Sequence, residues 1–155
     1  MFSNDLVIKI LNYIDNNLYK KITIDELSSI FHYNKDYIMR LFKREIGFTI
    51  VDYINRKRIF NSLQSYKFKN LSILKISINY GFYSQEYYCE VFHKIMGVSP
   101  STYYKFVNYN ENISIEKINI IQLNLALLDY SFRRINNYIN NVPPTSTVKV
   151  LSIFK

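Results

Sequence analysis

Apolar side chains recur every three or four positions over most of the chain, which is the spacing of amphipathic helices. In residues 5–18 the apolar positions are Leu6, Ile10, Tyr13, Ile14 and Leu18. A second, short helix is expected from Thr23 onward, because Thr23 is a good N-cap and Glu26, three positions later, completes a capping box. The buried stripe of this helix is predicted to consist of Leu27, Ile30 and Phe31.

A third helix is expected over residues 35–46, with Asn34 as its N-cap and Gly47 as its C-terminal stop. Its predicted inward positions are Tyr37 or Ile38, then Leu41, Phe42 and Ile46. Its outer face is polar and basic, with Arg40, Lys43 and Arg44. Two short helices joined by a tight turn, the second of them basic, are typical of a helix-turn-helix unit, although small helical bundles show the same pattern.

The same unit occurs twice in the chain. The stretch GFYSQEYYCEVFHKIMG matches HYNKDYIMRLFKREIG when positions are shifted by 50. The matched pairs include Asn34 with Ser84, Phe42 with Phe92, and Gly47 with Gly97. We therefore expect one helix-turn-helix unit over residues 23–47 and another over residues 72–97. Gly81 is expected in the second turn, and Pro100 is expected to open another short helix.

The segment between the two units, residues 49–66, contains no helix breaker and is predicted to form one linker helix. A helix of about 17 residues is roughly 25 Å long. A rigid spacer of this kind would hold two recognition helices about one DNA turn, ~34 Å, apart. This organisation assigns residues 1–108 to one DNA-binding domain and residues 109–155 to a C-terminal extension of unknown role.

The C-terminal extension has its own apolar pattern, with spacings that alternate between three and four. The positions are Ile118, Ile121, Leu125, Leu128, Phe132, Ile135 and Ile139. Such a seam favours a helix, although the I-x-I and L-x-L stretches also alternate as strands do. It suits dimerisation, packing against the rest of the chain, or a remnant of a larger sensor module. The last segment, residues 146–155, is expected to form a short strand or an ordered extension.

Composition narrows the class of protein. Of the 155 residues, 48% are hydrophobic and 21% are charged, as in an ordinary folded soluble protein, and only three are glycine, which favours helices. The formal net charge of +8 favours an anionic partner, with nucleic acid ahead of a membrane surface. A single cysteine, an N-terminus unlike a signal peptide and the lack of a long apolar run predict a cytoplasmic protein outside the membrane.

No pattern of catalytic or cofactor-binding residues stands out. Cys89 and His93 lie four positions apart, a spacing that suits two metal ligands, but the chain holds no other cysteine and only one other histidine, His32. Neither a nucleophile elbow nor a glycine-rich phosphate loop is present. We therefore expect no metal, no cofactor and no enzymatic activity.

The repeat and its flanking residues resemble the AraC/XylS family of bacterial transcription regulators. The resemblance rests on the stretches ITIDELSSIF, YIMRLFKREIGFTIVDYINRKRI and SILKISINYGFYSQEYYCEVFHKIMGVSPSTYYKF. The signature positions are Arg58, Ile59, Ile73, Ile76, Ser77, Gly81, Phe82, Phe92, Gly97, Ser99 and Pro100. The family resemblance implies an all-α fold of two helix-turn-helix units. It also implies one monomer that reads consecutive major grooves of an asymmetric site of about 20 bp, often bending the DNA.

The resemblance also implies which side chains face DNA. Candidate base contacts in the first unit are Lys35, Asp36, Met39 and Arg40, and in the second unit Gln85, Glu86, Tyr87, Cys89 and Glu90. Arg40 suits the edge of guanine and Gln85 suits adenine, because each side chain can make two hydrogen bonds with that base. Candidate phosphate contacts are Lys43, Arg44, Arg56, Lys57, Lys94 and Lys105. Arg58 is expected either to do the same or to brace the helices by pairing with a carboxylate.

The second unit departs from the usual family pattern at Lys75, Glu90 and His93. A carboxylate near phosphates lowers affinity unless it accepts from cytosine. We therefore expect the first unit to read bases directly, and the second to read weakly or mainly to position the protein.

These observations predict a sequence-specific DNA-binding regulator, an activator rather than a repressor, with double-stranded DNA and RNA polymerase as partners. Few residues precede the first helix, so no N-terminal effector domain is expected, and control would depend on abundance or on the extension. The alternative is a helical protein–protein interaction module that forms a homodimer through the seam at residues 118–139.

Overall fold

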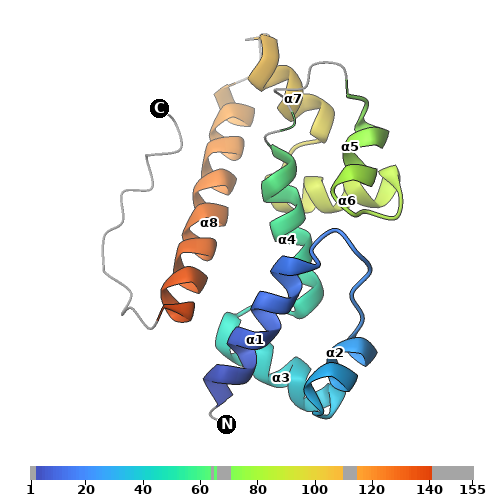
Figure 1. Ribbon diagram of the computed structural model, residues 1–155. Coiled ribbons are helices and arrows are strands. Elements are labelled where there is room, and N and C mark those ends of the chain that lie inside the picture. The colour runs from blue at the N-terminus through green and yellow to red at the C-terminus, as the bar shows by residue number, and fades with distance from the viewer. Residues whose placement is uncertain (1–2, 64, 66–70, 110–114, 141–155) are drawn as a thin grey trace.

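The structure, a computed structural model, describes residues 3–63, 65, 71–109 and 115–140, and these residues form helices and connecting loops without strands (Figure 1). The predicted all-α class is confirmed. In chain order the helices are α1 (Ser3–Asn16), α2 (Ile24–Phe31), α3 (Lys35–Ile46), α4 (Ile50–Ser62), α5 (Ile73–Asn79), α6 (Gln85–Met96), α7 (Pro100–Tyr109) and α8 (Ile115–Ile139). No helix within the described ranges combines the length and apolar character needed to span a membrane.

The helices begin where the sequence predicts caps. Thr23 and Glu26 form the predicted capping box, in which each side chain accepts a hydrogen bond from the backbone N–H of the other residue, at 3.2 and 3.4 Å. The side chain of Asn34 accepts from the N–H of Asp36 at the start of α3. Ser84 caps α6 in a similar way. These N-caps satisfy backbone donors that have no partner inside the helix.

The two recognition helices, α3 and α6, also end alike. Gly47 and Gly97 have φ values of +89° and +74°, in the left-handed region that favours glycine. The N–H of Gly47 donates to Lys43 and that of Gly97 donates to His93. The 50-residue repeat therefore extends from sequence to backbone conformation.

Each helix-turn-helix unit is built around its own apolar core. The first core lies among α1, α2, α3 and the start of α4, and the second lies among the end of α4, α5, α6 and α7. Phe42 and Phe92, at equivalent positions of the repeat, are both fully buried, one in each core. Their burial on the inner face of α3 and α6 fixes which face of each helix points outward.

Two predictions about buried positions are adjusted by the structure, which also gives the bounds of the linker helix. Ile30 was expected in the buried stripe of α2, but it is 43% exposed, and Leu27 is the buried residue of this helix. Of the two alternatives on α3, Ile38 is buried and Tyr37 faces outward. The linker helix α4 has 13 residues and is about 20 Å long, and residues 64 and 66 of the predicted linker helix lie outside the described residues.

The seam of the C-terminal extension forms the inward face of α8, a helix of 25 residues. Ile121, Leu125 and Leu128 join the second core, and Ile135 joins the first. Phe132 packs against both cores. In the view of Figure 1, α8 runs along the left side of the molecule, opposite α2 and α5.

The extension therefore packs back on its own chain. Ile121, Leu125, Leu128 and Ile135 of the seam are buried within one chain, and a homodimer through residues 118–139 stays a prediction. Residues 146–155, for which a strand or an extension was expected, lie outside the described residues.

Candidate nucleic-acid interface

The outer face of α3 carries the base and phosphate candidates of the first unit. All of them are exposed, namely Lys35, Asp36, Met39, Arg40, Lys43 and Arg44. On the opposite face, Phe42 packs edge-on against Tyr53 of α4, with ring centroids 5.8 Å apart. This packing holds α3 in place while its polar face remains open.

The outer face of α6 repeats these positions with different side chains. Glu86, Glu90, His93 and Lys94 are exposed, and Gln85 and Cys89 are half-buried. Phe92 anchors the inner face against Tyr103 and Tyr104 of α7. The structure thus brings the candidates of each unit together on one helix face, 50 residues apart in sequence.

The two faces differ in charge. On α3, Lys35 pairs with Asp25 and Arg44 pairs with Glu45, while Arg40 and Lys43 form no ion pair with any residue that the structure describes. On α6, one lysine stands beside two glutamates. An anion such as DNA is therefore attracted mainly to α3.

A stacked pair of tyrosines stands at the start of each recognition helix. The rings of Tyr33 and Tyr37 are 5.5 Å apart, and those of Tyr83 and Tyr87 are 4.6 Å apart. The hydroxyl of Tyr87 also accepts a hydrogen bond from Asn55 of α4, at 2.8 Å. Of these four tyrosines, only Tyr87 was predicted from the sequence as a DNA contact, although all four obey the 50-residue shift and could have been found by it.

Two phosphate candidates, Arg56 of α4 and Lys94 of α6, line one hollow of about 230 Å³ between their helices. The guanidinium of Arg56 lies over the ring of Phe48, 4.4 Å from its centre, and its buried Nε atom has no hydrogen-bond partner among the described residues. Glu90 lines the same hollow. With Asp52, which also lines the hollow, this arrangement places two cations and two carboxylates between the linker helix and the second recognition helix.

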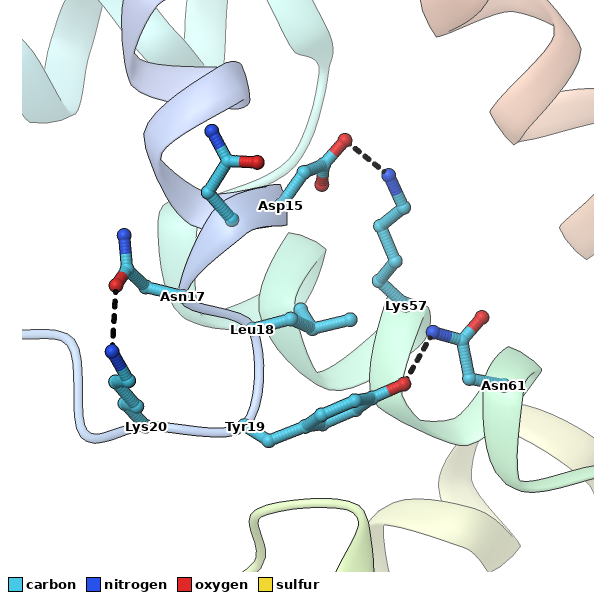
Figure 2. A pocket seen from close by; sticks show the side chains of 8 residues that line it. Asp15, Asn17, Leu18, Tyr19, Lys20, Lys57 and Asn61 are labelled. Atoms are coloured by element: carbon cyan, nitrogen blue, oxygen red, sulfur yellow. Dashed lines mark hydrogen bonds and ion pairs between the residues drawn. The ribbon is translucent and has the colours of Figure 1, made fainter.

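Lys57 points to a different part of the surface (Figure 2). Its ammonium group pairs with Asp15 of α1 at 2.6 Å, at the edge of a hollow of about 440 Å³. In the same hollow the amide of Asn61 donates to the hydroxyl of Tyr19. Lys57 therefore joins α4 to α1, and its assignment to a DNA phosphate stays a prediction.

Arg58 also braces the helices, but through different groups from those expected. Its guanidinium donates to the backbone carbonyls of Leu18 and Lys20, at 2.8 and 2.9 Å, and lies over the ring of Phe82. No carboxylate takes part among the described residues. Burial lowers the pKa of Arg58, but an arginine keeps its charge at neutral pH.

The remaining candidates lie apart from these contacts. Lys105 is exposed on α7. Partial burial, with Glu86 nearby, raises the pKa of the Cys89 thiol, which keeps it protonated at neutral pH. Within the described part of the chain, no three histidine, cysteine or acidic side chains are grouped so that they could hold a metal ion.

Two helix-turn-helix units, each with an exposed second helix held by a buried phenylalanine, define a helix-turn-helix DNA-binding protein. Comparison with known families identifies the group. The family model described as "Helix-turn-helix domain" matches residues 27–105, and the chain belongs to the AraC/XylS family of DNA-binding transcription regulators.

Individual relatives agree with this family. The chain is 28% identical over 116 residues to the HTH-type transcriptional activator AarP of Providencia stuartii, covering 74% of this chain and 86% of AarP. It is 38% identical over 101 residues to an uncharacterised response regulatory protein of Staphylococcus epidermidis, covering 63% of this chain but only 38% of that protein.

The fold also has a solved counterpart. The C-terminal domain of AraT, a response regulator from Geobacillus stearothermophilus, matches 71% of this chain and 92% of its own length with a TM-score of 0.62 and 22% sequence identity. This similarity establishes the arrangement of helices in the DNA-binding part.

Proposed function

We propose that the chain is a transcriptional activator that binds one asymmetric DNA site, with α3 and α6 in consecutive major grooves. The observation that supports this proposal is the repetition of one outward helix face. Each recognition helix has an N-cap, a buried phenylalanine and a left-handed glycine at positions related by the 50-residue shift. A major groove admits one α-helix, so two such helices on one chain suit two successive grooves.

The two recognition helices, α3 and α6, are proposed to contribute differently to DNA recognition. Arg40 lies in the middle of an exposed, cationic face and can donate two hydrogen bonds to guanine. The α6 face has two carboxylates, so it contributes less attraction and reads through Gln85 at its first turn. Because members of the AraC/XylS family often bend their DNA, we expect the DNA to bend toward the protein.

Activation and cellular location are further parts of the proposal. AarP is named a transcriptional activator, and it is similar to this chain over most of its length. An activator recruits RNA polymerase at a promoter, so RNA polymerase is the proposed protein partner and the cytoplasm, where bacterial DNA lies, the proposed location. No catalytic step is proposed.

The test is selection of binding sites from randomised duplex DNA by the purified chain. We expect one asymmetric sequence of about two helical turns to be enriched. Arg40→Ala should relax base choice at one end of the site and Gln85→Ala at the other, each by about 1–3 kcal/mol of discrimination. Gln122→Ala, on the exposed side of α8, is the control and should leave the selected sequence unchanged.

A defined result of the selection would refute sequence-specific DNA binding. If no sequence is enriched and binding disappears on adding salt, only nonspecific charge attraction remains. The activator part is tested separately, by placing the selected site upstream of a weak promoter in a transcription reaction with bacterial RNA polymerase. Repression or no change in transcript would refute activation while leaving DNA recognition intact.

A further inference from the structure

Helix α8 contacts both recognition helices at equivalent positions of the repeat. The side-chain amide of Asn124 donates to the backbone carbonyl of Met96, the last residue of α6, at 3.2 Å. The guanidinium of Arg134 donates to the backbone carbonyl of Ile46, the last residue of α3. Ile46 and Met96 are related by the same shift of 50 residues.

These contacts supply hydrogen-bond donors to the C-terminal ends of the two helices. The last carbonyls of a helix have no partner within it, and they carry the negative end of the helix dipole. Donors from α8 satisfy one such carbonyl on each recognition helix, and on α3 the donor is also a cation. Helix α8 therefore forms hydrogen bonds with the C-terminal ends of both recognition helices.

The glycines that end α3 and α6 allow this close approach. A Cβ atom at Gly47 would lie 2.8 Å from the guanidinium of Arg134. A Cβ atom at Gly97 would lie 2.5 Å from a methyl group of Ile120, on the same turn of α8 as Asn124. Both positions favour glycine for backbone conformation, and at Gly97 the contact with Ile120 of α8 adds a second reason.

Apolar packing holds α8 along both units at once. Phe132 packs edge-on against Tyr53 and Phe60 of the linker helix, with centroids 6.4 and 5.1 Å apart. Leu128 before it is buried in the second core, and Ile135 after it is buried in the first. Asn124 and Arg134 are ten residues apart, or about 15 Å along the helix axis.

We propose that α8 is a second connection between the two helix-turn-helix units, parallel in function to α4, and that it sets the spacing of DNA half-sites that the protein accepts. The units already touch where Tyr19 packs against Tyr80 and Gly81, and the contacts of α8 with both units restrict their separation and rotation further. Asn124 and Arg134 are the positioning residues of this device. The inference rests on the proposed two-groove function.

A fixed separation of the recognition helices would limit the spacing between DNA half-sites that the protein accepts. One inserted base pair moves the second half-site by about 3.4 Å and rotates it by about a tenth of a turn. A rigid pair of recognition helices cannot follow that change, while a loosely joined pair can. α8 therefore acts on the choice of spacing, without contacting DNA itself.

The first experiment measures affinity of the full chain for its selected site and for the same site with one base pair inserted or removed between the half-sites. Wild type should bind the altered sites about tenfold or more weakly. The double variant Asn124→Ala/Arg134→Ala should lose most of this difference. The control Gln122→Ala/Asn136→Ala, at two exposed positions of α8, should keep it.

A uniform loss of affinity for all three DNAs would mean that α8 only stabilises the fold, and it would overturn the inference. Equal discrimination by wild type and the double variant would overturn it as well. The variant Arg134→Lys keeps a cationic donor and should retain part of the discrimination, which guards against a variant that folds poorly.

A second measurement needs no DNA, so it separates this inference from the proposed function. Spin labels at Lys43→Cys and Lys94→Cys, in a Cys89→Ser background, report the distance between α3 and α6. The distance distribution should be narrow for the otherwise unchanged chain and clearly broader when Asn124 and Arg134 are replaced by alanine. An unchanged distribution would overturn the inference even if DNA recognition is confirmed.

Discussion

The side-chain amide of Asn55 donates to the hydroxyl of Tyr87 at 2.8 Å, and this hydrogen bond joins the linker helix to the second recognition helix. Asn55 is only 8% exposed, so its amide has little access to water. The first unit has no counterpart of this bond among the described residues, since Tyr37, at the equivalent position, faces outward. This contact, together with the buried hydrogen bond between Ser62 and Tyr88, fixes the orientation of α6 on α4.

Replacing Tyr87 by phenylalanine should lower the free energy of unfolding by about 1–2 kcal/mol, because a buried amide donor loses its acceptor while the ring is kept. Urea denaturation monitored by circular dichroism gives this value. Tyr37→Phe removes the equivalent hydroxyl in the first unit and is the matched control, with an expected change near zero. Similar losses in the two variants would show that the hydrogen bond does not carry the effect.

A second prediction separates lysines that contact DNA from lysines that brace the fold. Lys43 is exposed and unpaired among the described residues, whereas Lys57 is paired with Asp15. Lys43→Ala should weaken DNA binding for every sequence and reduce the slope of log affinity against log salt by about 1. Lys57→Ala should leave this slope unchanged and lower the free energy of unfolding by less than about 1 kcal/mol.

Titrations of both variants at several salt concentrations, with urea denaturation alongside, test this assignment. A reduced salt slope for Lys57→Ala would mean that its ammonium group leaves Asp15 to reach a phosphate. An unchanged slope for Lys43→Ala would remove α3 position 43 from the interface.

Features set by short stretches of sequence could be predicted well. The capping box at Thr23, the N-caps at Asn34 and Ser84 and the left-handed glycines at Gly47 and Gly97 depend on neighbours within a few positions, and all are confirmed. The repeat added the equivalence of α3 and α6, because a duplicated unit leaves the same cap and anchor positions in both copies.

Features set by distant partners could not be predicted in the same way. The Asn55–Tyr87 bond joins residues 32 positions apart, and the carbonyls that Arg58 contacts lie 38 to 40 positions away, with no local pattern to mark them. The apolar seam of α8 predicted a helix with one buried face. A regular apolar stripe can pack against a partner chain or against its own chain equally well. The direction of its packing needed the structure.

A third prediction concerns alkaline pH. Burial raises the pKa of Tyr88, whose hydroxyl lies among Ser62 and Tyr104, and partial burial together with the nearby Glu45 raises the pKa of Tyr138 to about 12. Below pH about 10 these phenols are neutral in folded and unfolded chains alike, so their contribution to stability is complete. Above it the unfolded chain ionises first, and stability should fall with rising pH.

Urea denaturation between pH 9 and pH 11 tests the direction of this change. Once the pH exceeds about 10, each buried tyrosine should cost about 1 kcal/mol per further pH unit. Tyr88→Phe should be less stable at neutral pH, because Ser62 and Tyr104 lose a partner, yet its stability should fall less steeply above pH 10. An equally steep fall in this variant would exclude Tyr88 as a source of the alkaline loss.

The last prediction compares the two glycines that end the recognition helices. Alanine at either position must adopt a left-handed backbone, which costs about 1–2 kcal/mol. At Gly47 the new methyl group meets the end of the Arg134 side chain, which can move aside at the cost of one hydrogen bond. At Gly97 it meets a branched methyl of Ile120, close to the backbone of α8 and packed against the second core, which cannot move as freely.

Gly97→Ala should therefore destabilise the chain more than Gly47→Ala in urea denaturation. Adding Ile120→Ala should recover the excess at Gly97 but none of the loss at Gly47, because only the former arises from contact with Ile120. Equal losses at the two glycines, with no recovery, would show that backbone conformation alone explains both and that α8 does not press on the end of α6.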